Sequence, residues 1–175
     1  MKITNLGQCF SIQDYPQFHG YSHAQSPQAI QVDNFIRVFF STRKIVAADQ
    51  KPISEVHFVD FNDDFTEVLN FSENPVIPVG DLGTFDEHGI FPFHPFMAKD
   101  KLYGFTSGWS RRSAVSVETS IGISMSSDNG LSFQRVGSGP ILTASLNEPF
   151  LVGDPWIVEN QGQYFMFYIS GTKWD

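Results

Sequence analysis

The sequence lacks several features that would place it in a familiar class of protein. It has one cysteine, Cys9, so an internal disulfide framework cannot form. It has no run of about 18 apolar residues, and its start, MKITNLGQ, has no apolar signal core. Basic residues are scarce, since 11 Lys and Arg face 19 Asp and Glu, giving a formal net charge of -8. These absences argue against a nucleic-acid or membrane surface and predict a cytoplasmic protein with a neutral partner.

Long periodic runs of helix-forming residues are also missing, whereas aromatic and turn-forming residues are abundant. The chain contains 18 Phe, 14 Gly and 10 Pro among its 175 residues. Phenylalanine favours strands, and Gly and Pro favour the tight turns that join them. A chain of this length can bury one core. The sequence therefore predicts a single all-β domain of many short strands.

Three segments of the sequence resemble one another. Each begins with one residue and a proline, then has an apolar strand, a polar turn and a second strand rich in aromatics: SPQAIQVDNFIRVFFSTR at 26–43, HPFMAKDKLYGFTSGWSR at 94–111 and DPWIVENQGQYFMFYISGTKW at 154–174. Segments 53–78 and 119–143 also match, because both read strand, Asp/Asn turn, strand, and then proline with two apolar residues. Such self-similarity marks a repeat architecture. Four antiparallel strands in each unit are typical of a β-propeller blade.

A turn motif in the second unit supports this interpretation. The stretch SMSSDNGLSF contains Ser126-x-Asp128-x-Gly130-x-Ser132-Phe133, which resembles the Asp-box of sialidase-type propellers. Asp128 can accept hydrogen bonds from the turn backbone, Gly130 can take a positive φ, and Phe133 can anchor the hairpin in the blade. The motif is interpreted as structural and not as part of a ligand site.

The chain is short for a closed propeller, which usually has about four to eight blades. It is predicted to hold about two and a half blades, with blade one at about 22–80, blade two at about 85–143 and the start of blade three at about 148–175. Residues 1–175 would then be a single propeller domain or the N-terminal part of one. Missing C-terminal blades or a second copy in a homo-oligomer would complete the ring, because an open edge invites pairing.

The sequence also resembles a known group of proteins. The resemblance is carried by GTFDEHGIFP, SGW, TSIGISMSSDNGLSFQRVGSGPIL, EPF, DPWIV and YFMFYISGTKW, and it covers the chain from about Ser22 to Asp175. These stretches are similar to glycosidase-like proteins often encoded with bacterial surface-polysaccharide genes. That group is similar to the five-bladed propellers of glycoside hydrolase families 32, 43, 62, 68 and 130. The resemblance implies a glycan-active propeller with a pocket on its central axis.

The resemblance further implies three carboxylates around the axis, one from each of the first three blades, at or near the residue before the proline. In this sequence the corresponding positions are Ser26, His94, and Gly153 or Asp154. Only blade three offers an acid there, so the chain departs from the ordinary pattern of the superfamily.

Glycoside hydrolysis commonly needs two carboxyl groups, one as acid and one as base or nucleophile. The adjacent Asp86 and Glu87 point to opposite faces if extended, so only one can line a pocket by neighbourhood. The resemblance repeats the Phe-Asp context before the innermost strand, which favours Asp86. The hypothesis is that Asp86 and Asp154 are acid and base in an order left open, and that His94 orients the substrate. A loop Asp bonded to backbone amides is the structural alternative for each acid.

Further residues are candidates for substrate binding because of their chemistry. Histidine, Gln and Ser can hydrogen-bond sugar hydroxyls, Trp can stack on a sugar face, and Arg can bind a carboxylate or phosphate with its planar fork. For each residue, core packing or a solvated rim is the alternative. The candidates are His23, Gln25, Ser26, Arg43, His88, Trp109, Arg111 and Glu148.

No metal-ligand spacing stands out, and no glycine-rich phosphate loop or nucleotide motif is present, so neither a metal nor a cofactor is predicted. The sequence leaves open whether a calcium ion binds on the propeller axis. The leading hypothesis is a glycosidase or phosphorylase-like enzyme acting on a bacterial oligosaccharide or polysaccharide. The alternatives are a non-catalytic glycan-binding propeller and, more weakly, a scaffold for protein partners.

Overall fold

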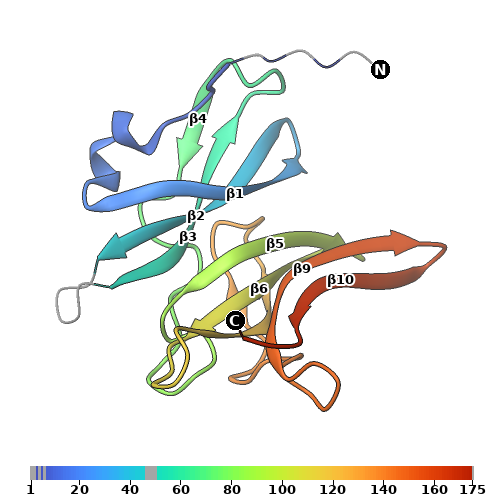
Figure 1. Ribbon diagram of the computed structural model, residues 1–175. Helices are drawn as coiled ribbons and strands as arrows, with labels where there is room; N and C mark the ends of the chain where they lie inside the picture. The colour runs from blue at the N-terminus through green and yellow to red at the C-terminus, as the bar shows by residue number, and fades with distance from the viewer. Residues whose placement is uncertain (1–2, 4, 6, 46–50, 175) are drawn as a thin grey trace.

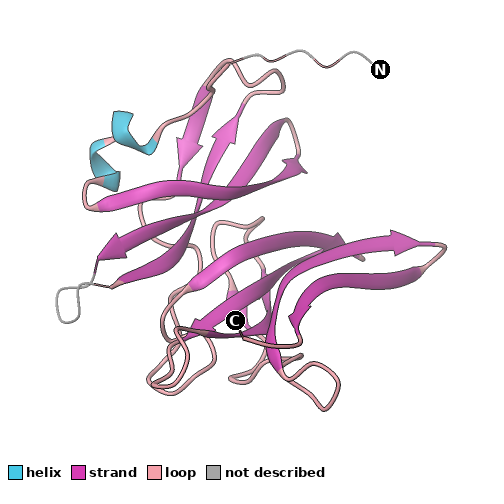
Figure 2. Cartoon of the chain, in the orientation of Figure 1, coloured by secondary structure: helices cyan, strands magenta, loops and turns pink. Residues whose placement is uncertain are grey.

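The computed structural model describes residues 3, 5, 7–45 and 51–174. They form an all-β fold with two short 3-10 turns near the N-terminus (Figures 1 and 2). No helix in this described part is long and apolar enough to cross a membrane. The elements are η1 (Ile12–Asp14), η2 (Pro16–Phe18), β1 (Tyr21–Val32), β2 (Phe35–Ile45), β3 (Pro52–Phe61), β4 (Val68–Phe71), β5 (Ile90–Ala98), β6 (Lys101–Ser110), β7 (Glu118–Ser126), β8 (Gln134–Arg135), β9 (Phe150–Asn160) and β10 (Gln163–Gly171).

The strands form three antiparallel sheets in sequence order. The first contains β1-β2-β3-β4, the second β5-β6-β7-β8, and the third the pair β9 and β10. Figure 1 shows the β9–β10 hairpin beside β5 and β6, with β1 to β4 on the other side of β5. This arrangement confirms the predicted fold class, because two four-stranded blades and the first hairpin of a third follow one another. The predicted blade limits, which include the connecting loops, stay predictions.

The segment between β4 and β5 joins the first two blades. Its Val76 donates a backbone hydrogen bond to Val56 in β3 at 2.8 Å, and the Val76 carbonyl accepts one from Phe133, just before β8, at 2.7 Å. Ile77 also bridges to Val56, and Leu142 makes the matching bridge to Ile121 in blade two. The repeated proline with two apolar residues therefore adds a short outer pairing to each blade.

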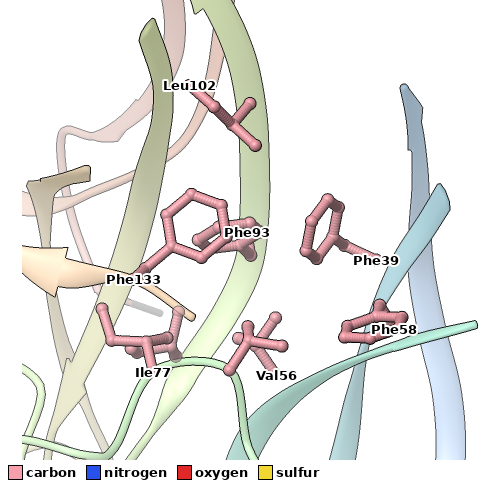
Figure 3. Close-up of a cluster of buried hydrophobic side chains, with 9 residues drawn as sticks. Phe39, Val56, Phe58, Ile77, Phe93, Leu102 and Phe133 are labelled. Atoms are coloured by element: carbon pink, nitrogen blue, oxygen red, sulfur yellow. The ribbon is translucent and has the colours of Figure 1, made fainter. Parts of the chain in front are cut away.

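The largest hydrophobic cluster fills the space between the first two blades and is called the interblade core here (Figure 3). Phe39 of β2 is fully buried, and its ring lies 5.3 Å from that of Phe93 and 5.6 Å from that of Phe133. The alternation of apolar residues along the strands brings these rings onto facing surfaces. The members of the cluster are Phe39, Val56, Phe58, Val76, Ile77, Ile90, Phe93, Leu102 and Phe133.

A buried ion pair crosses from β2 to β3 next to this core. The guanidinium of Arg37 donates to both carboxylate oxygens of Asp60 at 2.7 Å, and both residues are almost fully buried. Arg37 also donates to the carbonyl of Asn129 at 2.7 Å and lies over the Phe58 ring. This pair therefore ties blade one to the Asp-box turn of blade two.

The outer face of blade one carries a second cluster, covered by the N-terminal turns η1 and η2. Within this layer His57 is fully buried and packs against the rings of Phe18, Tyr21 and Phe40. Its Nδ1 atom lies 3.2 Å from the Ser72 hydroxyl. Burial lowers the pKa of His57 to about 4, because the charged ring would lose its water.

The Asp-box turn between β7 and β8 has the predicted structure. Asp128 accepts hydrogen bonds from the Ser132 backbone at 2.9 Å and from the Ser132 hydroxyl at 2.6 Å. Gly130 has a φ of 85°, and Phe133 is buried in the interblade core. Burial would raise the pKa of Asp128, but the hydrogen bonds from Ser132 and Ser126 outweigh it and hold that pKa below its usual value.

Replacing Asp128 by Ala is expected to lower the free energy of unfolding by about 1–2 kcal/mol, because the two bonds to Ser132 are lost in a partly buried turn. Urea unfolding followed by fluorescence would measure this. The matched control is Asp64→Ala in blade one, where the carboxylate caps Thr66 in an exposed turn and the effect should be clearly smaller. An equal or larger loss at Asp64 would contradict the assignment.

Candidate active site and neighbouring cleft

The innermost strands of the blades are irregular near the repeated proline. The register of β1 shifts between Ser22 and Gln25 and again before Gln28, and that of β9 shifts around Asp154. Ser26 and Asp154, which precede the prolines, have left-handed φ values of 48° and 52°. Strand bulges of this kind re-aim side chains and are common beside active sites. The blade-one and blade-three positions are therefore built alike.

In blade two the corresponding residue, His94, lies in a regular part of β5, since the shift there comes earlier, between Ile90 and Phe93. His94 is buried, and its ring lies 4.4 Å from the ring of Trp156 in β9. Burial lowers the pKa of His94, and the backbone of Ile157 offsets part of this change. Neither ring nitrogen has a well-formed hydrogen bond within the described part of the chain. The imidazole is thus neutral and faces blade three.

Asp154 lies on β9, two residues before Trp156, and both side chains are exposed on this chain. Its backbone N–H points to the Ser107 hydroxyl of β6 at 3.4 Å. Partial desolvation raises the pKa of the Asp154 carboxyl. A carboxyl with a raised pKa keeps its proton to higher pH, which is the property that a general acid needs.

Asp86 lies elsewhere. It is almost fully buried and accepts from the Nε of Arg135 in β8 at 2.8 Å and from the Thr84 hydroxyl at 3.2 Å. Its β-carbon packs against Gly108 of β6, whereas Asp154 lies against the preceding residue, Ser107. Neighbouring residues of a strand face opposite sides of the sheet. The structure therefore does not bring Asp86 and Asp154 together, and it gives Asp86 a structural ion-pair partner.

Four of the residues predicted to bind substrate do meet. Arg43, His88, Trp109 and Arg111 line one cleft of about 200 Å³ between blades one and two. We call it the basic cleft, and its remaining lining residues are Lys51, Pro52, Ser54, Ser116 and Val117. Arg43 comes from β2 and Arg111 follows β6, so the repeat places the two arginines at similar positions in successive blades.

The other predicted residues lie apart from this cleft. His23 is exposed, with its Nδ1 atom 2.8 Å from the Ser22 hydroxyl. The side-chain oxygen of Gln25 is buried without a hydrogen-bond partner among the described residues, and Ser26 is half-buried beside it. Glu148 accepts a hydrogen bond from the Tyr168 hydroxyl at 2.9 Å, which belongs to blade three. These positions stay predictions as substrate contacts.

Comparisons with known proteins bear on the fold. No family model matches the chain. A protein called "Uncharacterized protein MT1551", from Mycobacterium tuberculosis, is 28% identical over 108 residues, which cover 62% of this chain and 36% of that protein. The match thus spans about a third of the relative's length.

Three solved structures are similar in fold. The Bombyx mori GH32 β-fructofuranosidase BmSUC1 has a TM-score of 0.65 and 13% identity, over 83% of this chain and 29% of its own. The chain has the fold of a glycosidase-like β-propeller. Zg3597, a family 117 glycoside hydrolase from the marine bacterium Zobellia galactanivorans, has a TM-score of 0.58 and 14% identity, and the match covers 82% of this chain and 42% of Zg3597. An N-acetylgalactosamine deacetylase from F. plautii, in complex with blood group B trisaccharide, has a TM-score of 0.60 and 14% identity. The match covers 84% of this chain and 40% of the deacetylase.

Sequence reasoning missed several residues of this propeller's sites. Trp156 follows the Asp-Pro pair, and sequence reasoning assigned it no role because the bulge beside it appears only in the structure. Lys51 and Ser54 carried no pattern of their own, and Arg135 gave no sign of its pairing with Asp86 across 49 residues. Within the described ranges, no three His, Cys, Asp or Glu side chains lie close enough together to hold a metal ion.

Proposed function

We propose that this chain is part of a carbohydrate-active enzyme that cleaves glycosidic bonds of a bacterial glycan, with Asp154 as the proton donor. It would belong to the wider superfamily of five-bladed propellers that holds glycoside hydrolase families 32, 43, 62, 68 and 130. The observation that carries the proposal is the setting of Asp154. Its carboxyl stands at a left-handed bulge of an innermost strand, exposed and with a raised pKa, two residues from the Trp156 ring that packs on His94.

This setting suits the protonation of a leaving group. The raised pKa supplies a proton at higher pH than an ordinary Asp would. Trp156 offers an exposed aromatic surface on which a sugar ring can stack, and the neutral His94 can orient hydroxyl groups. The names of similar structures also favour a glycan, since one is a complex with a blood group trisaccharide and another with sucrose.

A glycan-binding propeller without catalysis is the second candidate. It is favoured by Ser26 and His94, which stand where the resemblance implies carboxylates, and by the ion pair that holds Asp86 away from Asp154. Hydrolysis by the usual route needs a second carboxyl group. The enzyme proposal therefore requires a base from outside Ser26, His94 and Asp86.

We expect Asp154→Asn in the protein of full natural length to lower kcat at least about 100-fold, because a positioned general acid contributes that much. The measurement is turnover of bacterial polysaccharides and aryl glycosides, with the pH profile of kcat/KM. The wild-type profile should fall as pH rises through the pKa of Asp154, and this fall should vanish in the variant. Asp63→Asn, in the exposed turn between β3 and β4, is the matched control.

Full turnover by the Asp154→Asn variant would overturn the assignment of the proton donor. If the wild-type protein binds glycans in this panel and turns over none of them, the binding candidate replaces the enzyme. Calorimetric titration of the same glycans separates these results, since it records binding without chemistry.

A further inference from the structure

We propose that the basic cleft binds the acidic group of a sugar unit, a carboxylate or a phosphate, while Trp109 stacks on its ring. The inference rests on the proposed function for the glycan and names a substrate class at a second place on the propeller. It differs from the neutral partner predicted from the net charge of -8. Local charge and not net charge decides what a cleft attracts.

The side chains of fixed charge that line the basic cleft, among the described residues, are all cationic. Arg43, Lys51 and Arg111 line it together with the ring of His88, and none of its lining residues within the described ranges is Asp or Glu. Arg43 is half-buried, and its guanidinium makes no hydrogen bond or ion pair with any residue of the described ranges. A guanidinium that is partly removed from water without an anion is favourably completed by one.

Two other lining side chains are held in place by the backbone. The Nη2 of Arg111 donates to the carbonyl of Pro52 at 2.6 Å, which holds the guanidinium group at the start of β3. The indole N–H of Trp109 donates to the carbonyl of Phe91 at 2.6 Å, so that the orientation of its ring is set before any ligand binds. Side chains ordered in advance lose less entropy on binding.

His88 is oriented as a hydrogen-bond donor. Its Nδ1 atom accepts from the backbone N–H of Arg111 at 3.3 Å, so the proton of the neutral ring sits on Nε2. Glu87 lies 3.4 Å from the same Nδ1 atom, but its carboxylate is used by the Gly83 backbone and the Ser110 hydroxyl. The cleft therefore combines cationic groups, an N–H donor and an aromatic ring, which together suit an acidic sugar.

A second cleft, mostly apolar but with Glu118 in its lining, neighbours the basic cleft. Val117 lines both, and the second cleft, of about 180 Å³, is walled by Phe150, Leu151 and Trp174 from the third sheet and the segment after it. Neighbouring sugar units of a longer chain would lie there. The lining residues of the two clefts come from blades one, two and three, so an oligosaccharide that occupies both would contact all three blades.

The test is calorimetric titration of the protein of full natural length with matched pairs of sugars. The probes are glucuronic, galacturonic and mannuronic acid with glucose, galactose and mannose, and glucose 6-phosphate with inorganic phosphate. At least one acid should bind about 10-fold more tightly than its neutral parent. Arg43→Gln should remove that preference, and Arg43→Glu should reverse it.

Arg112→Gln is the matched control, because Arg112 is an exposed arginine next to the cleft that pairs with Glu118 and does not line it. It should keep the preference. No preference for acid over neutral sugar in any pair, or an equal loss in Arg112→Gln, would overturn the proposal. Inorganic phosphate binding as tightly as glucose 6-phosphate would also overturn it, because the sugar ring would then contribute nothing.

The two proposals fail separately. Acid-selective binding that depends on Arg43 would stand even if Asp154→Asn left turnover unchanged. Turnover that depends on Asp154 but shows no acid selectivity would leave the proposed function intact and remove only the basic cleft.

Discussion

Replacing Asp60 by Ala is expected to lower the free energy of unfolding by about 3–5 kcal/mol, which would unfold a large fraction of a marginally stable chain. The change leaves the Arg37 guanidinium buried without its two partner oxygens, at a site where both residues are 3% exposed or less. The remaining bond from Arg37 to the Asn129 carbonyl cannot neutralise the charge. Urea or guanidinium unfolding, followed by fluorescence and circular dichroism together, would measure the loss.

The cause of that loss can be isolated with a double variant. Arg37→Met with Asp60→Leu removes both charges and keeps apolar volume, so it should recover most of the stability lost by Asp60→Ala. Arg112→Gln breaks the exposed pair with Glu118 and should cost well under about 1 kcal/mol. A loss below about 1 kcal/mol in Asp60→Ala would show that the pair is not needed.

Acid is expected to destabilise the fold through His57. The pKa of His57 is about 4 in the folded chain and about 6.5 in an unfolded one. Above pH 6.5 both states are neutral at this ring and the full stability is present. As pH falls from 6.5 to 4, only the unfolded state takes up the proton, so stability is lost by about 1.4 kcal/mol per pH unit, roughly 3 kcal/mol in all.

Free energies of unfolding measured by urea titration between pH 7 and 4 would test this slope. His57→Gln should flatten it, because an amide in this place does not titrate. His94 contributes with the same sign, since burial also lowers its pKa. His19, which is exposed, gives the matched control as His19→Gln, and an unchanged slope in His57→Gln would refute the assignment.

The blades were predictable from sequence because their signals are local. Each repeated segment holds a residue-proline pair, an apolar strand, a polar turn and an aromatic strand within about twenty residues. The hairpins β1–β2, β5–β6 and β9–β10 form over these three segments. The Asp-box turn is local in the same way. The register shifts in β1 and β9 were not predicted, because nothing in the alternation of residues marks where a bulge inserts.

The sites were predictable only in part because they depend on distant pairing. Arg43 and Arg111 were linked by the repeat and do meet in one cleft. The ion pair of Asp86 was not predicted, because its partner Arg135 lies 49 residues away and a carboxylate looks the same in sequence whether it is salt-bridged or catalytic. Burial and partner, which decide between these roles, appear only with the fold.

The connection through Val76 has a consequence for how the chain can be cut or rearranged. Val76 is hydrogen-bonded to β3 of blade one and to Phe133 of blade two, so this segment is part of the packing between the blades and not a free linker. We expect both blades to lose hydrogen-exchange protection in one cooperative step. Proteolytic cleavage or insertion of a tag in the segment between β4 and β5 should therefore destabilise both blades. Neither blade should be exchangeable as an independent module between related proteins.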